Sequence, residues 1–531
     1  MNRLTKIIAG LAILLLASCT QDYNQLNSNP NAVGANVFDP DYLLSTAEWG
    51  YANTGTNQLL FEAMWSQCLS STYYYYSNGD KYAYGGSYLT YVANPWDDDF
   101  TNAGDLYTMQ QLCKGNAHYQ NLSAIGEIMK ICILQRLTDE FGDIPYSQAL
   151  QAADGITDPA YDAQSSIYPA MLASLDSAIQ QLSASAPTPT ADVIYSGNIA
   201  EWQKFGYTLM LRMAMRLVNI DASDAQKYAE EAATGGTFTS NSDNAFISGD
   251  PATGFSNGTS NELLVSSDFE TVKWTTPFID SLRYNADPRL GVIGEIAQNG
   301  AANNANESLA GNTDSSAQLG MPNGYDQLGG TTDISNAPGY PGPSPAVGSG
   351  DSPAPLGYYS RPTAAMYMNK SGPNFILTYA ESELLLAEAA ARGWSVSGTA
   401  ATHYANAVAA AMESLSTFGG TVTPAQATTW ATAHPLITTS QSAELEQINT
   451  QYWLETGTTF NFIENWINWK RTGYPTLTPV NYPGNFTGGT IPRRIIYPQE
   501  ETSTNEANYS AEVAKLTGGD AWTTKTWWDT Q

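Results

Sequence analysis

Two carboxylates at a four-residue spacing, Asp139 and Asp143, are the first candidates for chemistry in this sequence. A glycosidase places two carboxyl groups about 5–9.5 Å apart across a cleft, one as the acid and one as the nucleophile or base. Spacing along the chain does not establish that separation. Gly142 and Pro145 are residues that end helices and form turns, so the pattern favours a helix end held by side-chain hydrogen bonds over a catalytic pair.

Metal-binding residue types are sparse or badly spaced. The acidic run at residues 97–99 suits calcium, but it lacks the EF-hand spacing, and acids in a first helical turn also suit the helix dipole. The three histidines, at 118, 403 and 434, lie far apart, and there is no Cys-x-x-Cys pair. The sequence therefore predicts no metal and no cofactor, with calcium at residues 97–99 as the alternative.

A tyrosine-rich run is the strongest candidate for binding a ligand. Sugars present flat C–H faces edged by hydroxyls, which suit aromatic rings flanked by amides and carboxylates. Each stacked ring contributes about 1 kcal/mol, so several rings are needed for micromolar affinity, about −8 kcal/mol. The alternative is a β-hairpin whose alternating tyrosines pack on the scaffold. The candidates here are Tyr73, Tyr74, Tyr75, Tyr76, Tyr82 and Tyr84, followed by Tyr88 and interleaved with Asn78 and Asp80.

Four more aromatic residues are candidates for the same ligand: Trp96, Trp274, Tyr325 and Tyr340. Trp96 is the weakest, because a tryptophan at a helix start is often part of the core. The other three lie in or beside a stretch rich in Gly, Asn, Ser and Pro. Trp527 and Trp528 are interpreted as packing residues.

The N-terminus resembles a bacterial export signal. Arg3 and Lys6 precede an apolar run at residues 7–16, which at about 1.5 Å per residue is too short for a bilayer core of roughly 30 Å. Leu16–Cys19 resembles a lipobox, so we expect a signal peptide over 1–18, lipid on Cys19 and a polar tether over 19–40. The alternative is an ordinary signal peptide with a chance cysteine.

Three cysteines remain after Cys19, which is an odd number: Cys68, Cys113 and Cys132. Cys132 lies in an apolar run and reads as a small buried hydrophobe. A disulfide between Cys113 and Cys132 is left open by the sequence.

The composition restricts the choice of partners. Of 531 residues, 42% are hydrophobic, which is enough for a large core, and 51 acidic against 22 basic residues give a net charge of −29. This charge repels phosphate backbones, so nucleic-acid binding is excluded. In a chain this poor in base we expect arginines in internal ion pairs: Arg136 with Asp139, and Arg493 and Arg494 with Glu500 and Glu501.

Apolar spacing predicts a helical scaffold. Apolar residues recur at three- and four-residue steps over 164–183, 202–218, 376–391 and 404–415, and the last two segments resemble a tetratricopeptide-like helix pair. Ser223 and Gln226 form an expected capping box for a further helix to Ala233. Turn-forming residues dominate 235–375, so we expect one domain over 41–531, with helices at 41–234 and 376–531 and a loop-rich insert between them.

Several strings, taken in order, resemble the SusD/RagB outer-membrane lipoproteins of Bacteroidetes. Each string alone is weak, but together they cover nearly the whole chain. One departure is that Asp22 is the only acid directly after Cys19, whereas family members often carry several there as a surface-export signal. The strings are DEFGDIPYSQAL (139–150), the helix from Trp202 to Arg216, DPRL (287–290), YAESELLLAEA (379–389), WINWKRTGYP (466–475), IPRRIIYP (491–498) and WWD (527–529).

The resemblance implies a mostly α SusD-like fold, with tetratricopeptide-like helix pairs and the ligand held by loops. It also implies a binding protein and not an enzyme: a lipid-anchored outer-membrane protein, facing the cell exterior, that binds an oligosaccharide or a peptide. The implied partner is a SusC-like TonB-dependent β-barrel transporter, which receives the ligand. The alternatives are a surface glycoside hydrolase or peptidase, and an adhesin without a transporter.

Overall fold

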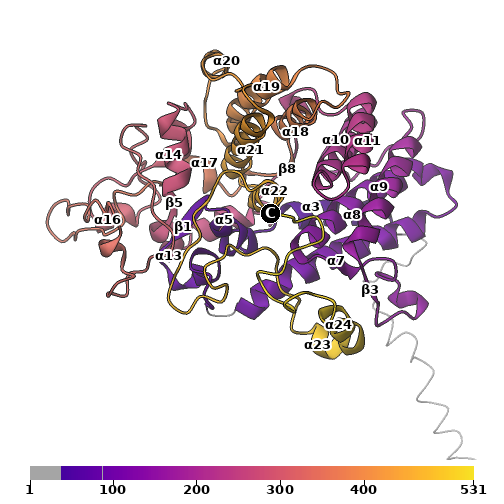
Figure 1. Cartoon of the computed structure of the whole chain (residues 1–531), viewed down its shortest axis with the longest axis horizontal. Coiled ribbons are helices and arrows are strands. Elements are labelled where there is room, and N and C mark those ends of the chain that lie inside the picture. The colour runs from indigo at the N-terminus through magenta and orange to yellow at the C-terminus, as the bar shows by residue number, and fades with distance from the viewer. Residues whose placement is uncertain (1–37, 86–87) are drawn as a thin grey trace, which may run out of the picture.

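The computed structural model describes residues 38–85 and 88–531, and helices make up most of its regular structure (Figure 1). This confirms the expected mostly helical fold. The predicted signal peptide, Cys19 and nearly all of the predicted tether lie outside the described residues. Among the described residues, no helix is both long and apolar enough to cross a bilayer.

Five long helices form the first half of the scaffold, and each packs on the next along the chain. Apolar residues at helical spacing form their buried faces, as at Trp202, Phe205 and Leu209 of α10. The five are α7 (Tyr88–Cys113), α8 (Gln120–Phe141), α9 (Gln164–Gln181), α10 (Ile199–Arg216) and α11 (Ala222–Gly235). Shorter helices precede them: α3 (Asp41–Ala52), α4 (Asn57–Leu60), α5 (Glu62–Trp65) and α6 (Ser77–Asp80).

The second half of the scaffold follows the insert and packs beside α10. Helices α18 and α19 form the predicted pair, and small residues, including Ala380, Ala410 and Ala411, line their contact. The helices are α18 (Tyr379–Ala391), α19 (Ala400–Glu413), α20 (Pro424–Ala433), α21 (Gln441–Thr458), α22 (Phe462–Thr472), α23 (Glu501–Thr504) and α24 (Glu506–Val513).

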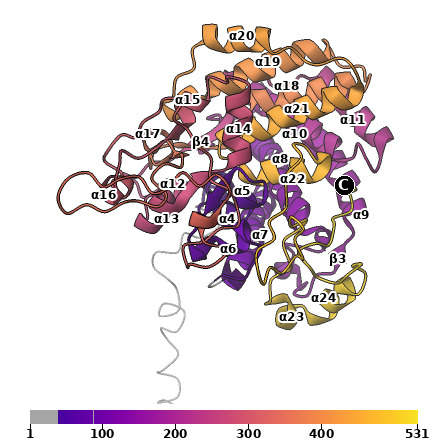
Figure 2. The same cartoon turned by 60° about the vertical axis from the view of Figure 1, so that its left-hand side comes forward.

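The insert is built of loops and short helices that extend to one side of the long helices (Figure 2). It has a small core of its own around Met321, Ile334 and Tyr359. Its helices are α12 (Gly258–Leu263), α13 (Ser266–Thr271), α14 (Thr276–Tyr284), α15 (Leu290–Ile293), α16 (Ala301–Asn304) and α17 (Ala364–Tyr367).

Among the described residues there are four antiparallel pairs of short strands, and three of them join segments that are distant in sequence. The pair β1–β5 matters most for function, because it aligns Ser70 with Lys273 and so fixes the tyrosine-rich run against the insert. The pairs are β1 (Leu69–Ser71) with β5 (Val272–Trp274), β2 (Ile144–Pro145) with β3 (Tyr161–Asp162), β4 (Ala245–Ser248) with β8 (Pro373–Leu377), and β6 (Gly294–Glu295) with β7 (Arg361–Pro362).

Two predicted helix starts are wrong. Ile376 and Leu377 belong to strand β8, and the helix begins after Thr378, whose hydroxyl accepts a hydrogen bond from the Glu381 amide (3.0 Å). At α11 the cap is Asp221, whose carboxylate accepts from the Asp224 amide (3.1 Å), so the helix starts earlier than a Ser223 cap would allow.

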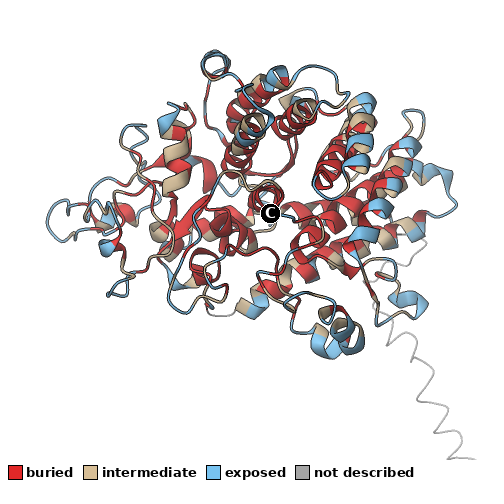
Figure 3. Ribbon diagram, in the orientation of Figure 1, coloured by how far each residue is buried: buried red, intermediate tan, exposed pale blue. Residues whose placement is uncertain are grey.

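The buried residues run continuously through both halves of the scaffold, whereas exposed residues lie on the outer helix faces, the insert loops and α23 and α24 (Figure 3). The C-terminal segment closes this core. Trp528 is fully buried and its indole N–H donates to Asp139 of α8 (2.8 Å). This contact confirms Trp528 as a packing residue.

Candidate functional site

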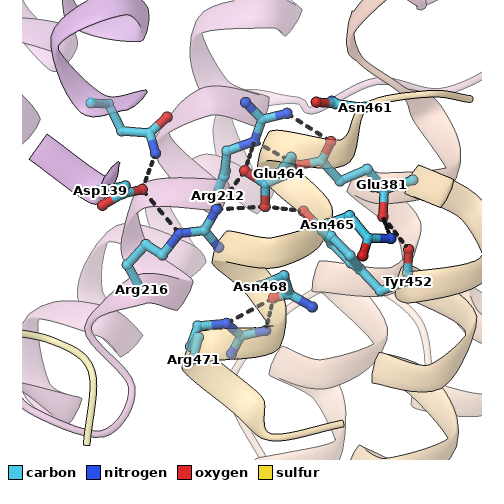
Figure 4. Close-up of polar contacts among 12 residues, drawn as sticks. Asp139, Arg212, Arg216, Glu381, Tyr452, Asn461, Glu464, Asn465, Asn468 and Arg471 are labelled. Carbon is cyan, nitrogen blue, oxygen red and sulfur yellow. Dashed lines mark hydrogen bonds and ion pairs between the residues drawn. The ribbon is translucent and has the colours of Figure 1, made fainter. Parts of the chain in front are cut away.

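Asp139 lies at the edge of a buried polar network and not in a cleft (Figure 4). One carboxylate oxygen accepts from the hydroxyl of Tyr168 and the indole of Trp528, and the other accepts from Gln135 and from Nε of Arg216 (3.2 Å). The side chain is inaccessible to solvent. It therefore cannot reach a substrate, and the structural interpretation of this motif is the correct one.

Two arginines one helical turn apart on α10 hold the centre of the network (Figure 4). Arg212 forms a two-pronged ion pair with Glu381 of α18 (2.6 and 2.7 Å), and Arg216 reaches Glu464 of α22 (2.5 Å). Tyr452 donates to Glu464 (2.6 Å). The pairing with Arg216, together with Arg212, lowers the pKa of Glu464 although burial alone would raise it.

The same pattern continues along α22. Arg471 forms a two-pronged ion pair with Glu388 of α18 (2.8 and 2.7 Å). Lys470 donates to the Asp139 carbonyl (2.7 Å) and lies 3.8 Å from the ring centroid of Trp466. All of these side chains are buried. The network thus joins five strings that identify the family resemblance, and each of them serves the scaffold.

The expected arginine ion pairs form, but with other partners. Arg136 pairs with Asp99 of α7, Arg493 with Asp529, and Arg494 with Asp520. The carboxylates nearest in sequence are not the partners of these arginines. Packing between helices and the return of the C-terminal segment decide which carboxylates lie within reach of each guanidinium group.

The tyrosine-rich run is not a hairpin. Residues Tyr74–Tyr76 form a 3₁₀ turn that leads into α6, so side chains leave the backbone in several directions. Tyr73 and Tyr74 point outward with 40% and 58% of their surface exposed. Tyr75 is half-buried and donates to the Tyr91 hydroxyl (2.6 Å). Two rings of the run are therefore free to stack on a ligand.

Tyr84 forms a second aromatic surface with residues from other elements. Its ring is 49% exposed and lies 4.3 Å from that of Tyr88 and 4.8 Å from that of Phe486, measured between centroids. Phe486 lies in the loop between α22 and α23 and donates its amide to the Tyr82 carbonyl (2.7 Å).

A groove of about 690 Å³ lies where this loop meets the insert. Its walls carry amide, hydroxyl and proline groups, and Tyr325 supplies its one aromatic ring. We call Tyr73, Tyr74, Tyr84, Tyr88 and Phe486 the aromatic platform, and we take these rings together with this groove as the candidate binding face. The groove residues are Gln67, Thr276, Pro277, Pro322, Asn323, Gly324, Tyr325, Thr331, Thr332, Pro338, Thr476, Leu477, Thr478, Pro479, Val480, Asn481 and Pro483.

Four predicted ligand-binding residues are buried and are corrected here. Tyr76 donates to Asp268 (2.5 Å), and Tyr82 is fully buried. Trp274 stacks on Phe278 (4.7 Å) inside the core, because β5 is covered on both faces. Trp96 is 6% exposed and packs among other rings of the core, beside a separate hollow.

The remaining two candidates differ. Tyr325 is half-buried and lines the groove. Tyr340 lies outside the groove lining, packs on the small core of the insert and donates to the Pro355 carbonyl (3.0 Å). Of the ten predicted rings, Tyr73, Tyr74, Tyr84 and Tyr325 therefore lie on the candidate binding face.

The groove and platform also use residues that the sequence analysis did not select. Phe486 and Asn481 come from residues 473–490, more than 390 positions from the tyrosine run. Their signal was the density of Gly, Pro, Asn and Thr in this segment, which marks a long surface loop.

In the part of the chain that the structure describes, no three histidine, cysteine, aspartate or glutamate side chains are grouped so that they could hold a metal ion. The acidic run 97–99 lies in the middle of α7, not in its first turn, and Asp99 is paired with Arg136. The thiols of Cys68, Cys113 and Cys132 are free and buried, so the disulfide left open by the sequence is not formed.

Comparison with known proteins identifies the family. Residues 30–498 match the family model SusD-like, described as starch-binding and associating with the outer membrane. A solved structure of a chitin-binding protein is 30% identical, covers 93% of this chain and 100% of its own, and superimposes with a TM-score of 0.78. No curated protein matches the chain.

Two further structures share the fold. One is a SusD-like protein of Bacteroidetes AC2a (23% identity, 93% and 100% coverage, TM-score 0.77), and the other is a chitin-binding SusD homologue from Flavobacterium johnsoniae (24%, 93% and 98%, 0.71). The family match extends over most of the chain and agrees with the helical scaffold described above. This chain belongs to the SusD-like family of outer-membrane-associated glycan-binding proteins.

Proposed function

We propose that this protein binds an oligosaccharide of N-acetylglucosamine units, as found in chitin, on its candidate binding face. The observation that carries the proposal is the aromatic platform: the rings of Tyr73, Tyr74 and Tyr84 are exposed, and the segment that carries them is hydrogen-bonded through Asp80 to the wall of a groove lined by amides and hydroxyls. Rings of this kind stack on sugar faces, while the exposed amide of Asn481 and the threonine hydroxyls of the groove pair with hydroxyl and acetamido groups.

The sugar class rests on the relative at 30% identity, which is a chitin-binding protein. Starch is the competing glycan, because the family description names it. Peptides remain the other ligand class that the family resemblance implies. Neither the groove lining nor the platform contains a charged side chain, which suits an uncharged saccharide.

The proposal includes delivery. The protein, held at the outer membrane by lipid on Cys19 and facing outward, passes its ligand to a SusC-like β-barrel transporter without cleaving it. The engagement of both Asp139 oxygens in the scaffold supports the absence of catalysis by this motif.

The test uses residues 20–531 and isothermal titration with chitohexaose, maltohexaose and a casein-derived peptide mixture. We expect saturable binding of chitohexaose alone, with a dissociation constant in the micromolar range, and intact hexamer in the recovered ligand. Binding of only maltohexaose or peptide would overturn the sugar class, and shortened chitohexaose would overturn the non-catalytic role.

Delivery is tested in membranes. We expect a β-barrel of the outer membrane to co-purify with the full-length protein after mild detergent extraction. A full-length protein that purifies alone, although it binds chitohexaose, would overturn the transporter partnership and leave an adhesin.

A further inference from the structure

Most of the candidate binding face comes from three segments that are far apart in sequence. The tyrosine run (residues 72–84) comes from the first half of the scaffold, residues 321–332 from the insert, and residues 476–486 from the loop after α22. None of these segments is a long helix that would hold its own shape. Something must therefore fix the distance between the platform and the groove.

Asp80, the last residue of α6, contacts the insert directly. One of its carboxylate oxygens accepts from the side-chain amide of Asn323 (2.9 Å), and the other accepts from the backbone amide of Gly324 (2.9 Å). The Asp80 side chain is fully buried. Both of the bonds cross from the tyrosine run to the wall of the groove.

The neighbouring residue, Lys81, balances the negative charge of Asp80. Lys81 lies 3.2 Å from the carboxylate, is itself buried, and donates to the Ser71 carbonyl (2.8 Å). Asn323 donates a second bond to the carbonyl of Leu69 (3.1 Å). The carboxylate thus joins strand β1, α6 and the insert in one polar cluster, and a buried charge with paired bonds is far more costly to disturb than a neutral contact.

Gly324 permits this close approach. Its φ of +83° lies in the left-handed region, and a Cβ at this position would lie 2.5 Å from Val480 Cγ1. The amide that Asp80 binds is therefore part of a backbone turn pressed against the third segment. A further bond joins the third segment to the insert, from the Tyr482 hydroxyl to Asp326 (2.7 Å).

We infer that Asp80 is a positioning residue that holds the aromatic platform and the groove at a fixed separation, so that the binding face is formed before ligand arrives. The inference rests on the proposed function. A preformed face binds more tightly than one that must be ordered on binding, since the ordering entropy is already lost.

The central variant is Asp80→Asn, which keeps the shape of the side chain but replaces one acceptor oxygen with an amide. That amide then opposes the donor of Asn323 or of Gly324. We expect faster hydrogen exchange at residues 321–328, with the long helices unchanged, and about tenfold weaker binding of chitohexaose.

Two further variants separate positioning from simple loss of stability. Asp287→Asn removes a buried carboxylate that pairs with Arg289 (2.7 Å) away from the groove lining, so it should lower the melting temperature without changing exchange at 321–328 or affinity. The double variant Asp80→Asn with Asn323→Asp reverses the direction of the bond between the two side chains. The double variant should recover part of the protection from hydrogen exchange at residues 321–328 and part of the affinity for chitohexaose.

Chitohexaose binding tests the proposed function, and hydrogen exchange tests the positioning role, so either one can be contradicted without the other. If wild-type protein binds no chitohexaose, the proposed function is wrong, and hydrogen exchange still tests the link between the segments. If Asp80→Asn leaves exchange at 321–328 unchanged, or if Asp287→Asn weakens binding as much as Asp80→Asn does, the positioning role is overturned.

Discussion

The buried network under the scaffold and the candidate binding face use polar residues in opposite ways. In the network, Arg216, Glu464 and Asp139 are shielded from water and each finds a fixed partner. On the binding face, Tyr74 and Tyr84 keep about half of their surface exposed. The first arrangement specifies one way to pack the helices, whereas the second leaves groups free for a ligand.

This difference shows why the family could be identified before the ligand site. The strings of the resemblance supply most of the charged residues of the network. Each of these buried charges needs its partner, so the residues must be present together. The binding face has no such string. It lies on loops, where the scaffold tolerates changes in sequence and where specificity can differ between relatives.

The largest expected effect is in the network. Arg216→Ala removes the cation between Asp139 and Glu464, and leaves two carboxylates buried without it. We expect the free energy of unfolding to fall by about 3–5 kcal/mol, measured by urea denaturation at pH 7. Chitohexaose affinity of the protein that remains folded should not change. A loss of less than about 1 kcal/mol would show that the network is dispensable.

The second prediction concerns the pH dependence of stability, through Glu455, which is buried near Glu381 of the network. Burial, with Glu381 nearby, raises the pKa of Glu455 to about 8. An unfolded glutamate has a pKa of about 4.3, so between about pH 4.3 and pH 8 the folded protein keeps a proton that the unfolded chain has lost. The contribution of Glu455 to stability therefore falls as pH rises through this window.

Glu455→Gln removes this titration and keeps the shape of the side chain. We compare the free energy of unfolding of the variant and of wild type in parallel urea titrations at several pH values. As pH rises from 5 to 8, the difference should grow by about 2–4 kcal/mol in favour of the variant. Equal pH slopes for the two proteins would contradict the raised pKa. Chitohexaose affinity serves as the control and should be the same in both.

On the binding face the expected effects are smaller and concern affinity alone. Tyr74→Ala and Tyr84→Ala each remove one exposed ring, so each should weaken chitohexaose binding about fivefold, which corresponds to about 1 kcal/mol. Stability should stay within about 0.5 kcal/mol of wild type. Isothermal titration and thermal melts measure the two quantities separately.

Tyr42→Ala is the matched control for these variants. Tyr42 is 61% exposed on α3 and lies outside both the platform and the groove lining. Its removal should leave affinity unchanged. Equal losses for Tyr42→Ala and Tyr74→Ala would mean that the platform does not contact the sugar.

The smallest expected effect comes from an ion pair outside the network. Arg283 and Asp280 lie 3.7 Å apart on the surface of α14, each about one third exposed. Arg283→Ala should change stability by less than about 0.5 kcal/mol, because water solvates the carboxylate that is left behind. The ratio of this value to that for Arg216→Ala measures how much burial matters for the same chemical group.

The helices were largely predictable because their signal is local. Apolar residues at three- and four-residue steps located α9, α10 and α19 from sequence. The start of α18 was missed since Ile376 and Leu377 continue its apolar pattern, and only pairing with β4 shows that they form a strand. That pairing connects residues more than 120 positions apart.

The binding face was predictable only in part, for a related reason. Aromatic composition correctly selected Tyr73, Tyr74 and Tyr84 as exposed rings, but it does not report burial. Trp274 has the same chemistry and lies in the core, because its strand pairs with β1. The contribution of Phe486 depends on where a distant loop returns, which no local pattern encodes.

The division of charge between core and surface has a consequence for the outside of the molecule. In the described part of the chain, ten lysine and arginine side chains and twenty aspartate and glutamate side chains are buried, so carboxylates still outnumber cations among the side chains that reach the surface. Two copies that approach one another through these surfaces repel, and so does an anionic polysaccharide. The excess of carboxylates at the surface thereby keeps crowded neighbours apart and turns anionic polymers away, while an uncharged sugar chain meets no such barrier.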